Sequence, residues 1–524
     1  MGSRPSRRAE LEALRRRMVD RGAGRDEIAA EFVRVHGARP RSAYRLACGW
    51  TFQRAVEEIN RQAVLAGSDP DGRAGLTVSR LSELEAWPAG GRRPTPQMLA
   101  LLASAYQTGL HRLLDEADRE RYAPADLLLI DGFVHREPAI AVPARPEDGP
   151  GGPDQPTRSS AGGLEFPAQW LDAIDTAATL FRRDVQTRSG GRGSGFDPGA
   201  YTKPVMRWLT SSFEERPRGR GRRPVGAPQV EIIHRATGLF RELDNQYGGG
   251  HVRELVARFL DAEVAPLLRE GRFEEPVGSA LLSAAAELTQ LAGWTAYDAG
   301  FHGLGQRYLI QALRLALAAV DRPLGAEIIA AMSHQAAYLG AAEEAVDLAR
   351  AASRTAADAG VVAIAAEAAV LEAHGLALQG EQRSCAAALD RAERSLDKAD
   401  RHGDPRWIGY FDEAYLSARF GHCFVALGRG DLATRFATRS LEMDSRYVRG
   451  RQFNLVLLAR AHAQAGDIEE AAAVGIEAAA AADGLNSARS VDYLRDLADR
   501  LAKHAGLPAV DALTERLAAV GATG

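Results

Sequence analysis

The chain has 524 residues, of which 46% are hydrophobic and 6% aromatic, and a formal net charge of −4. This length exceeds what one hydrophobic core usually fills, so two or three domains are expected. The three cysteines, Cys48, Cys385 and Cys423, lie far apart in the sequence, which argues against a disulfide framework and a paired-cysteine zinc site. No apolar run is long enough to cross a bilayer and the N-terminus is charged, so we expect a soluble cytoplasmic protein with no membrane partner.

Basic charge is concentrated in two segments of the chain. Residues 1–100 hold 18 Lys and Arg against 12 Asp and Glu, and residues 182–235 hold 12 against 5, whereas the rest is acidic. Clustered basic charge is typical of surfaces that meet nucleic acid. The alternative is that these arginines are merely solvated.

Hydrophobic residues recur with helical spacing, and no stretch predicts a strand, so the expected fold class is all-α. Short amphipathic helices fill residues 8–130, which predict a first domain. A polar segment at 67–72 leads from the fourth helix to the next. The first four helices are expected at residues 11–21, 25–35, 41–49 and 51–62, the last with Thr51 as its N-cap.

Residues 77–86 predict a short helix with polar and basic side chains on one side and Val78, Leu81 and Leu84 toward the core. Together with the helix before it, this has the layout of a helix-turn-helix domain, in which the second helix enters the major groove of DNA. The residues expected to meet double-stranded DNA are Thr77, Ser79, Arg80, Ser82, Glu83, Arg92 and Arg93.

These residue types suit DNA contact for different reasons. The Arg80 guanidinium could bond a guanine with two hydrogen bonds, and Thr77 and Ser79 could reach phosphates or bases. Arg92 and Arg93 lie in the following turn, where backbone phosphates would be met. The alternative is that these are surface charges of a domain that no longer binds DNA.

The middle of the chain is predicted to be mostly linker. Residues 136–163 are dense in Pro, Gly, Asp and Ser, which predicts a flexible linker. Residues 164–228 predict one helix near 167–183 and then a disordered basic stretch interrupted by an apolar patch. Within it, residues 217–224 approach the AT-hook pattern, in which Arg-Gly-Arg lies in a narrow minor groove. A basic tether or an idle linker are the alternatives.

Residues 229–522 show a recurring pattern of helix, glycine-containing turn and helix, with spacings of 40, 40, 48 and 38 residues. A small residue follows each of the last four turns by five positions, where it would let paired helices approach closely. The pattern predicts a tetratricopeptide-like α-solenoid of about five helix pairs with a concave groove. The turns end at Gly300, Gly340, Gly380, Gly428 and Gly466, and the small residues are Ala345, Cys385, Ala433 and Ala471.

One repeat concentrates aromatic and polar residues among neighbours that are mostly Ala or Leu. These residues could form one wall of a groove for a peptide or small-molecule effector, with Asp298 or Arg307 fixing a terminal charge. The alternative is that Trp294 and Tyr308 are core between repeats and that Asp298 belongs to turn chemistry. The candidate groove residues are Trp294, Tyr297, Asp298, His302, Arg307, Tyr308 and Gln311.

The sequence lacks the motifs of the common enzyme classes. No lysine follows a glycine, so a phosphate loop of the Gly-Lys type is excluded, and His-Glu-x-x-His and Gly-x-Ser-x-Gly are also missing. We therefore predict no catalytic residue, no metal ligand and no cofactor.

Three parts of the N-terminal segment carry a family resemblance. Residues 45–53 resemble the first helix and turn, and residues 79–85 the recognition helix, of the bacterial repressor-like helix-turn-helix regulators known as the XRE class. Residues 92–96 resemble the segment that follows. The chain departs from the family in the extra residues 63–75 and in Glu83, where such proteins often carry a basic residue.

The C-terminal half extends the resemblance. Its motifs look like those of actinobacterial regulators that join this domain to tetratricopeptide repeats, a group similar to negative regulators of differentiation and antibiotic production in streptomycetes. The resemblance implies a DNA-binding transcriptional regulator whose repeats bind a peptide, metabolite or protein effector, with a homodimer as the default for reading palindromic sites. The alternative is a repeat adaptor whose helix-turn-helix domain serves protein interaction. The motifs lie at residues 243–250, 287–294, 297–300, 306–308 and 332–335.

Overall fold

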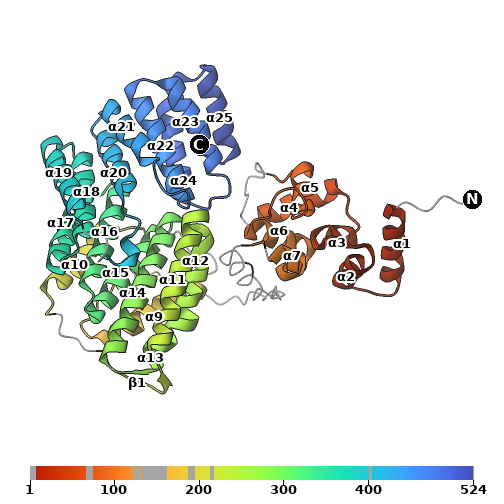
Figure 1. Ribbon diagram of the computed structural model, residues 1–524, viewed down its shortest axis with the longest axis horizontal. Coiled ribbons are helices and arrows are strands. Elements are labelled where there is room, and N and C mark those ends of the chain that lie inside the picture. The colour runs from red at the N-terminus through yellow and green to blue at the C-terminus, as the bar shows by residue number, and fades with distance from the viewer. Residues whose placement is uncertain are drawn as a thin grey trace, which may run out of the picture. The chain divides into compact units, whose positions relative to one another are not determined.

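A computed structural model shows two compact units, residues 1–156 and 157–524. The secondary structure of the described residues is almost entirely helical, which confirms the all-α prediction (Figure 1). None of the described helices is long and apolar enough to cross a membrane. The structure describes residues 7–65, 75–119, 121–122, 130, 162–186, 195–212, 217–399 and 404–522.

The N-terminal unit packs short helices around one hydrophobic core. The four helices predicted before residue 65 are present, with ends shifted by a few residues. Thr51 caps the fourth helix, because its Oγ1 accepts a 3.2 Å hydrogen bond from the Arg54 N–H. The predicted polar segment at 67–72 lies outside the described residues. The helices are α1 (Arg7–Asp20), α2 (Arg25–His36), α3 (Pro40–Ala47), α4 (Phe52–Leu65), α5 (Val78–Ala86), α6 (Pro96–Tyr106), η1 (Leu110–Leu113) and α7 (Glu116–Arg119).

The second unit begins with ordered structure where the sequence predicted mostly linker. The helix expected near 167–183 is α9 (Trp170–Gln186), and the apolar patch inside the expected disordered stretch forms η2 (Pro198–Tyr201) and α10 (Thr202–Thr210). Trp208 of α10 is buried, and its indole N–H donates to Thr355 Oγ1 at 3.1 Å. The prediction of disorder was wrong for the described part of this stretch, because its few apolar side chains are buried against the repeats. Of the linker predicted at 136–163, only residues 162 and 163 are described.

Three short strands correct the expectation that the chain has none. β1 (Gly219–Arg220) pairs antiparallel, and β2 (Arg223–Pro224) parallel, with β3 (Gly271–Phe273). A Cβ on Gly221 would lie 1.9 Å from the Glu270 carbonyl oxygen. The Arg-Gly-Arg spacing therefore has a structural role, since only glycine allows this close approach of backbones.

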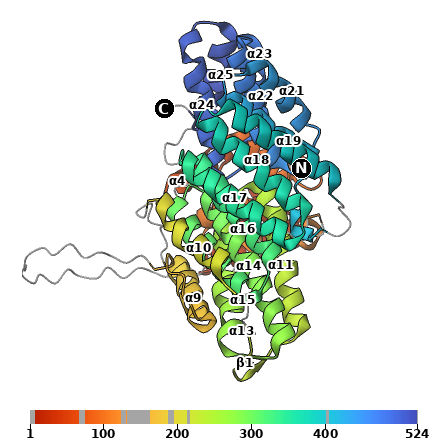
Figure 2. The ribbon, with the colours of Figure 1, turned by 90° about the vertical axis from the view of Figure 1, so that its left-hand side faces the viewer.

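Paired antiparallel helices form the rest of the second unit and stack in sequence order (Figure 2). The five predicted pairs are present, and a sixth, not predicted, follows them. Preceding helices are α11 (Ala227–Tyr247), α12 (Gly249–Phe259), η3 (Leu260–Val264) and α13 (Ala265–Glu270). The pairs are α14 (Glu275–Asp298) and α15 (His302–Ala319), α16 (Arg322–Tyr338) and α17 (Ala342–Ala359), α18 (Val362–Leu378) and α19 (Gln382–Lys398), α20 (Glu413–Ala426) and α21 (Gly430–Ser440), α22 (Val448–Ala465) and α23 (Ile468–Ala481), and α24 (Ala488–Leu501) and α25 (Pro508–Ala519).

The predicted turns and small residues fall where the helix pairs need them. All five turn glycines have φ between +72° and +96°, a backbone conformation that favours glycine. The four small residues after the turns are fully buried. Short glycine turns and small contact residues therefore set the hairpin geometry that makes the region a helical solenoid.

The last helices of the solenoid return to its beginning. The Asn486 N–H donates to the Tyr247 carbonyl at 2.8 Å, and the Asn486 carbonyl accepts from Gly250 N–H at 2.9 Å. Arg449 of α22 forms two hydrogen bonds, of 2.5 and 2.7 Å, with buried Asp244 of α11. These contacts join α11 to α22 and to the loop before α24, and so close the repeats around an interior space.

Candidate nucleic-acid interface and ligand cavity

Helix α5 presents the side chains predicted to meet DNA. Leu81 and Leu84 are buried in the core, while the five candidate residues between positions 77 and 83 are exposed. The expectation that Val78 faces the core was wrong, since this side chain is 39% exposed. The first turn of α5 therefore projects beyond the core, and its exposed polar side is continuous.

Thr77 fixes the start of α5. It is the N-cap, and its Oγ1 accepts a 3.3 Å hydrogen bond from the Arg80 N–H. Such a cap stabilises a helix by about 1 kcal/mol. The cap also sets the backbone from which the exposed Arg80 side chain projects.

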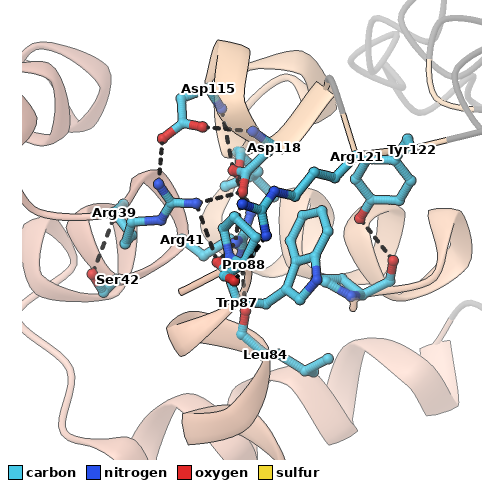
Figure 3. Close-up of polar contacts among 12 residues, drawn as sticks. Arg39, Arg41, Ser42, Leu84, Trp87, Pro88, Asp115, Asp118, Arg121 and Tyr122 are labelled. Carbon is cyan, nitrogen blue, oxygen red and sulfur yellow. Dashed lines mark hydrogen bonds and ion pairs between the residues drawn. The ribbon is translucent and has the colours of Figure 1, made fainter. Parts of the chain in front are cut away.

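The C-terminal end of α5 is held by a buried arginine from α3 (Figure 3). Arg41 donates to the carbonyls of Leu84 at 2.9 Å and Trp87 at 2.5 Å, and it pairs with Asp118 at 2.8 Å. Arg39 adds a second ion pair to Asp118, at 2.7 Å. Carbonyls at the end of a helix lack partners within the helix, so this cluster satisfies them and fixes α5 against α3.

A second buried pair links α3 with α5. Arg45 Nε and Nη2 donate to the two carboxylate oxygens of Glu85 at 2.7 and 2.9 Å. Burial raises the pKa of Glu85, and the hydrogen bonds from Arg45 oppose that shift. From the sequence, Arg41, Arg45 and Glu85 could be predicted only as members of helices. Their buried partners could not be predicted, because these lie 40 or more positions away in the chain.

Arg92 and Arg93 are exposed in the turn after α5, as predicted. The Arg92 N–H donates to the Glu83 carbonyl at 3.3 Å, which fastens this turn to the helix. The Arg93 guanidinium carbon lies 5.6 Å from the centre of the Tyr122 ring. All seven candidate DNA contacts thus lie on one exposed helix and the turn bonded to it.

The solenoid encloses a cavity of about 480 Å³. Side chains of α11, α14, α16, α18, α20, α22 and α24 line it, together with the loop at 406–412. Four lining residues are exposed and mark its mouth, namely Arg406, Gly409, Asp412 and Arg446. A cavity of this size and mixed lining is typical of small-molecule sites.

The seven predicted groove residues do not form one wall. Trp294 lines the cavity, and Tyr297 lies behind it, with ring centres 5.5 Å apart and its hydroxyl 3.1 Å from His334 Nδ1. His302 is half-buried and packs against the Tyr297 ring. Asp298 is fully buried, where it accepts hydrogen bonds from Gly249 N–H and the Ser487 hydroxyl and pairs with Arg449 at 3.3 Å.

The other three predicted groove residues hold the segment before the repeats. The Tyr308 hydroxyl donates to Asp184 at 2.8 Å, and Gln311 Nε2 donates to the Gly163 carbonyl at 2.9 Å. Arg307 donates to the Gly303 carbonyl, and its side chain would contact a Cβ on Gly163. These residues lie on α15, which packs against α9, and none of them lines the cavity.

A pair of glutamates forms a polar wall of the cavity. The Tyr410 hydroxyl lies 2.8 Å from Glu327 Oε1 and 2.9 Å from both oxygens of Glu367. Burial, followed by repulsion from Glu327, raises the pKa of Glu367 well above its ordinary value. The neutral form of the Glu367 carboxyl is therefore favoured relative to that of an exposed glutamate.

Two further arginines line the cavity, and neither was singled out from the sequence. The Arg489 guanidinium carbon lies 4.6–5.8 Å from the centres of five aromatic rings, and Arg419 donates to the Tyr415 hydroxyl at 2.9 Å. The rings around Arg489 belong to Trp294, Tyr297, Tyr338, Phe453 and Tyr493. Because these residues come from different repeats, no local spacing in the sequence could have brought them together.

Comparison with known proteins gives no relative on which to base a function. No protein-family model matches the chain, and no curated protein matches it either.

Proposed function

We propose that the chain is a DNA-binding transcriptional regulator whose helical-repeat unit binds an effector. The proposal rests above all on α5, a short capped helix that exposes Ser79, Arg80 and Ser82 while Leu81 and Leu84 anchor it in the core. A helix of this width fits the major groove, where side chains near its N-terminus reach base edges. The basic excess of residues 1–100 supplies the attraction to phosphates.

Each exposed residue has a distinct role in this proposal. Arg80 reads a base, since guanidinium bonds guanine O6 and N7 together. Thr77 and Ser79 contact phosphates or base edges, and Arg92 and Arg93 bind the phosphate backbone. The buried Arg41 and Arg45 act indirectly, because they position α5 and do not themselves reach DNA.

The repeat unit supports the effector part of the proposal. Its interior cavity is lined by aromatic and charged side chains from α11 to α24, which is the chemistry of a ligand site. An effector can change DNA affinity only to the extent that it binds the DNA-competent form more tightly or more weakly than the other form.

A second function is favoured by Glu83. This carboxylate is exposed on the same helix as Arg80, where it would repel phosphates. In that case the N-terminal unit docks another protein, and the repeats act as an adaptor. The two functions differ in DNA retention at low salt, which only the first predicts.

The proposal is tested by titrating the purified full chain against a mixed-sequence DNA duplex over a series of salt concentrations. We expect log Kd to rise linearly with log salt, since basic side chains displace counterions from the phosphates. Absence of binding at the lowest salt would exclude the regulator and leave the adaptor.

A further inference from the structure

Arg419 is a cavity arginine that has no paired carboxylate among the described residues. It lies on α20, lines the cavity and is only partly buried. Its guanidinium donates to the Tyr415 hydroxyl, and no carboxylate of the described residues lies within 4.0 Å. A guanidinium carries five N–H donors, so most of them have no protein partner among the described residues.

The other arginines around the cavity are neutralised or exposed. Arg449 bonds both oxygens of Asp244, and Arg489 has its faces covered by aromatic rings and lies 3.7 Å from Asp298. Arg241 pairs with Glu287 at 3.1 Å. Arg406 and Arg446 are exposed at the mouth, where Arg446 pairs with Asp444 at 2.7 Å.

Glu367 is connected to Arg419 only through a tyrosine hydroxyl. The Tyr415 hydroxyl links Arg419 to Glu367, with a contact of 3.2 Å to Glu367 Oε1. Burial and repulsion from Glu327 raise the pKa of Glu367, which weakens the negative charge that this carboxyl can offer to Arg419. The positive charge of Arg419 is thus left without a directly paired carboxylate inside a cavity, which is an unfavourable state that an anionic guest would relieve.

Part of the cavity lining is apolar and aromatic. Trp294, Tyr493 and Phe453 line the cavity together with small side chains such as Ala330 and Ala418. Aromatic walls next to small residues leave a flat, apolar space in which a planar ring can stack.

We propose that this cavity binds a small organic anion that carries an aromatic ring, with its carboxylate or equivalent oxyanion paired with Arg419. The ring packs against the aromatic and small apolar side chains of the lining, such as Trp294, Ala330 and Ala418, and the guanidinium donates two parallel hydrogen bonds to the anionic group. The volume of about 480 Å³ holds one molecule of this size.

This inference names the chemical class of the effector. The biological meaning of the inference rests on the proposed function. Binding to the cavity is nevertheless independent of DNA. An experiment without DNA therefore separates failure of this inference from failure of DNA recognition.

The test uses two matched probes, 1-naphthaleneacetate and 1-naphthaleneacetamide, which differ in the charge of one group. Calorimetric titration of the full chain at low salt should show the acetate binding about tenfold or more tightly than the amide, because a hydrogen-bonded charge pair contributes more than a neutral contact. The acetate affinity should fall with added salt, and that of the amide should not. Equal binding of the two probes, or no binding of either at millimolar concentration, would overturn the proposal.

Two variants locate the charge. Arg419→Met keeps the aliphatic stem and should reduce acetate binding about tenfold or more, to the level of the amide. Arg354→Met makes the same change on the exposed surface of α17, away from the cavity, and should leave both affinities unchanged. Loss of acetate binding in both variants, or in neither, would contradict the assignment to Arg419. If Arg419→Met does not fold, as judged by circular dichroism, the wild-type comparison of acetate with amide and its salt dependence decide the question alone.

Discussion

Arg41 and Asp118 form an ion pair of 2.8 Å in the interior of the N-terminal unit, and neither side chain has any exposed surface. The same guanidinium bonds two carbonyls, those of Leu84 and Trp87, at the end of α5. The pair therefore couples the core of the unit to the helix proposed to read DNA.

Breaking this pair should destabilise the N-terminal unit strongly. Asp118→Ala leaves the Arg41 charge buried and unpaired, which should cost about 3–5 kcal/mol of unfolding free energy. Replacing both residues, as in Arg41→Met with Asp118→Leu, should cost less, because no isolated charge remains buried. Hydrogen exchange of the α3 and α5 amides in the full chain measures both effects. Glu31→Ala removes an exposed pair with Arg34 and serves as the control, with little change expected. Equal losses in the single and double variants would contradict this account of the pair.

Removing Arg80 should affect DNA binding differently from removing Arg92 and Arg93 together. Arg80→Ala should cost about 1–3 kcal/mol at a specific site and relax base preference at one position. Arg92→Ala with Arg93→Ala should weaken binding to all duplexes alike and reduce the salt slope, since phosphate contacts carry no sequence information. Fluorescence anisotropy with specific and mixed duplexes separates the two patterns. The roles assigned here do not hold if both variants lose the same affinity for every duplex.

Gly91 should tolerate no side chain. Its φ is +76°, and a Cβ would lie 2.2 Å from the Glu83 carbonyl oxygen. Gly91→Ala should therefore displace the turn that carries Arg92, at a cost of roughly 1–3 kcal/mol for the strained backbone, and weaken DNA binding. Gly90→Ala is the matched control, because a Cβ there meets nothing within 4 Å. Thermal unfolding and anisotropy should distinguish the two variants, and an unaffected Gly91→Ala protein would contradict the prediction.

Buried histidines should make the second unit acid-sensitive. Burial lowers the pKa of His374 to about 3 and of His251 to about 4, whereas the unfolded chain titrates near 6.5. Below that pH the unfolded state binds more protons, so stability falls as pH drops from about 6.5 toward 4. The slope is about 1.4 kcal/mol per pH unit for each such histidine. The His374→Gln variant should lose less unfolding free energy than wild type between pH 7.5 and 5.5, as measured by denaturant unfolding. An unchanged loss of unfolding free energy would show that His374 is protonated when folded.

Glu367 should have the opposite pH dependence. Its pKa is raised by burial and by Glu327, so the folded state holds a proton that the unfolded state loses above about pH 4.5. Stability contributed by the neutral form is lost as pH rises toward the folded pKa. Glu367→Gln has no proton to lose, and its stability relative to wild type should therefore increase from pH 5 to pH 8. A constant or decreasing difference would mean that Glu367 is ionised when folded.

The repeating part of the fold could be predicted because its signals are local. Gly340 and Ala345 belong to one helical hairpin, and the pattern of helix, glycine turn and helix around them repeats along the chain. Helix α5 could be predicted for the same reason, since the cap Thr77 and the anchors Leu81 and Leu84 lie within one short segment. The dimer, the DNA and the effector are predictions that the described structure does not test.

The contacts between distant segments could not be predicted. Arg41 meets Asp118, and Asp244 meets Arg449, across 77 and 205 positions of sequence. The cavity is built in the same way, because Trp294, Arg419 and Arg489 come from separate helices that only the curvature of the solenoid brings together. The strand β3 was missed because its three residues carry no alternating pattern and are ordered by pairing with β1 and β2.

Genome-wide capture of DNA by the purified full chain, compared with the Arg80→Ala variant, tests the central claim most directly. We expect the wild-type chain to enrich fragments that share one sequence motif, and the variant to bind DNA while losing preference at one position of that motif. Failure of the wild-type chain to retain any fragment at low salt, or an identical motif in the variant, would contradict the claim that α5 reads DNA.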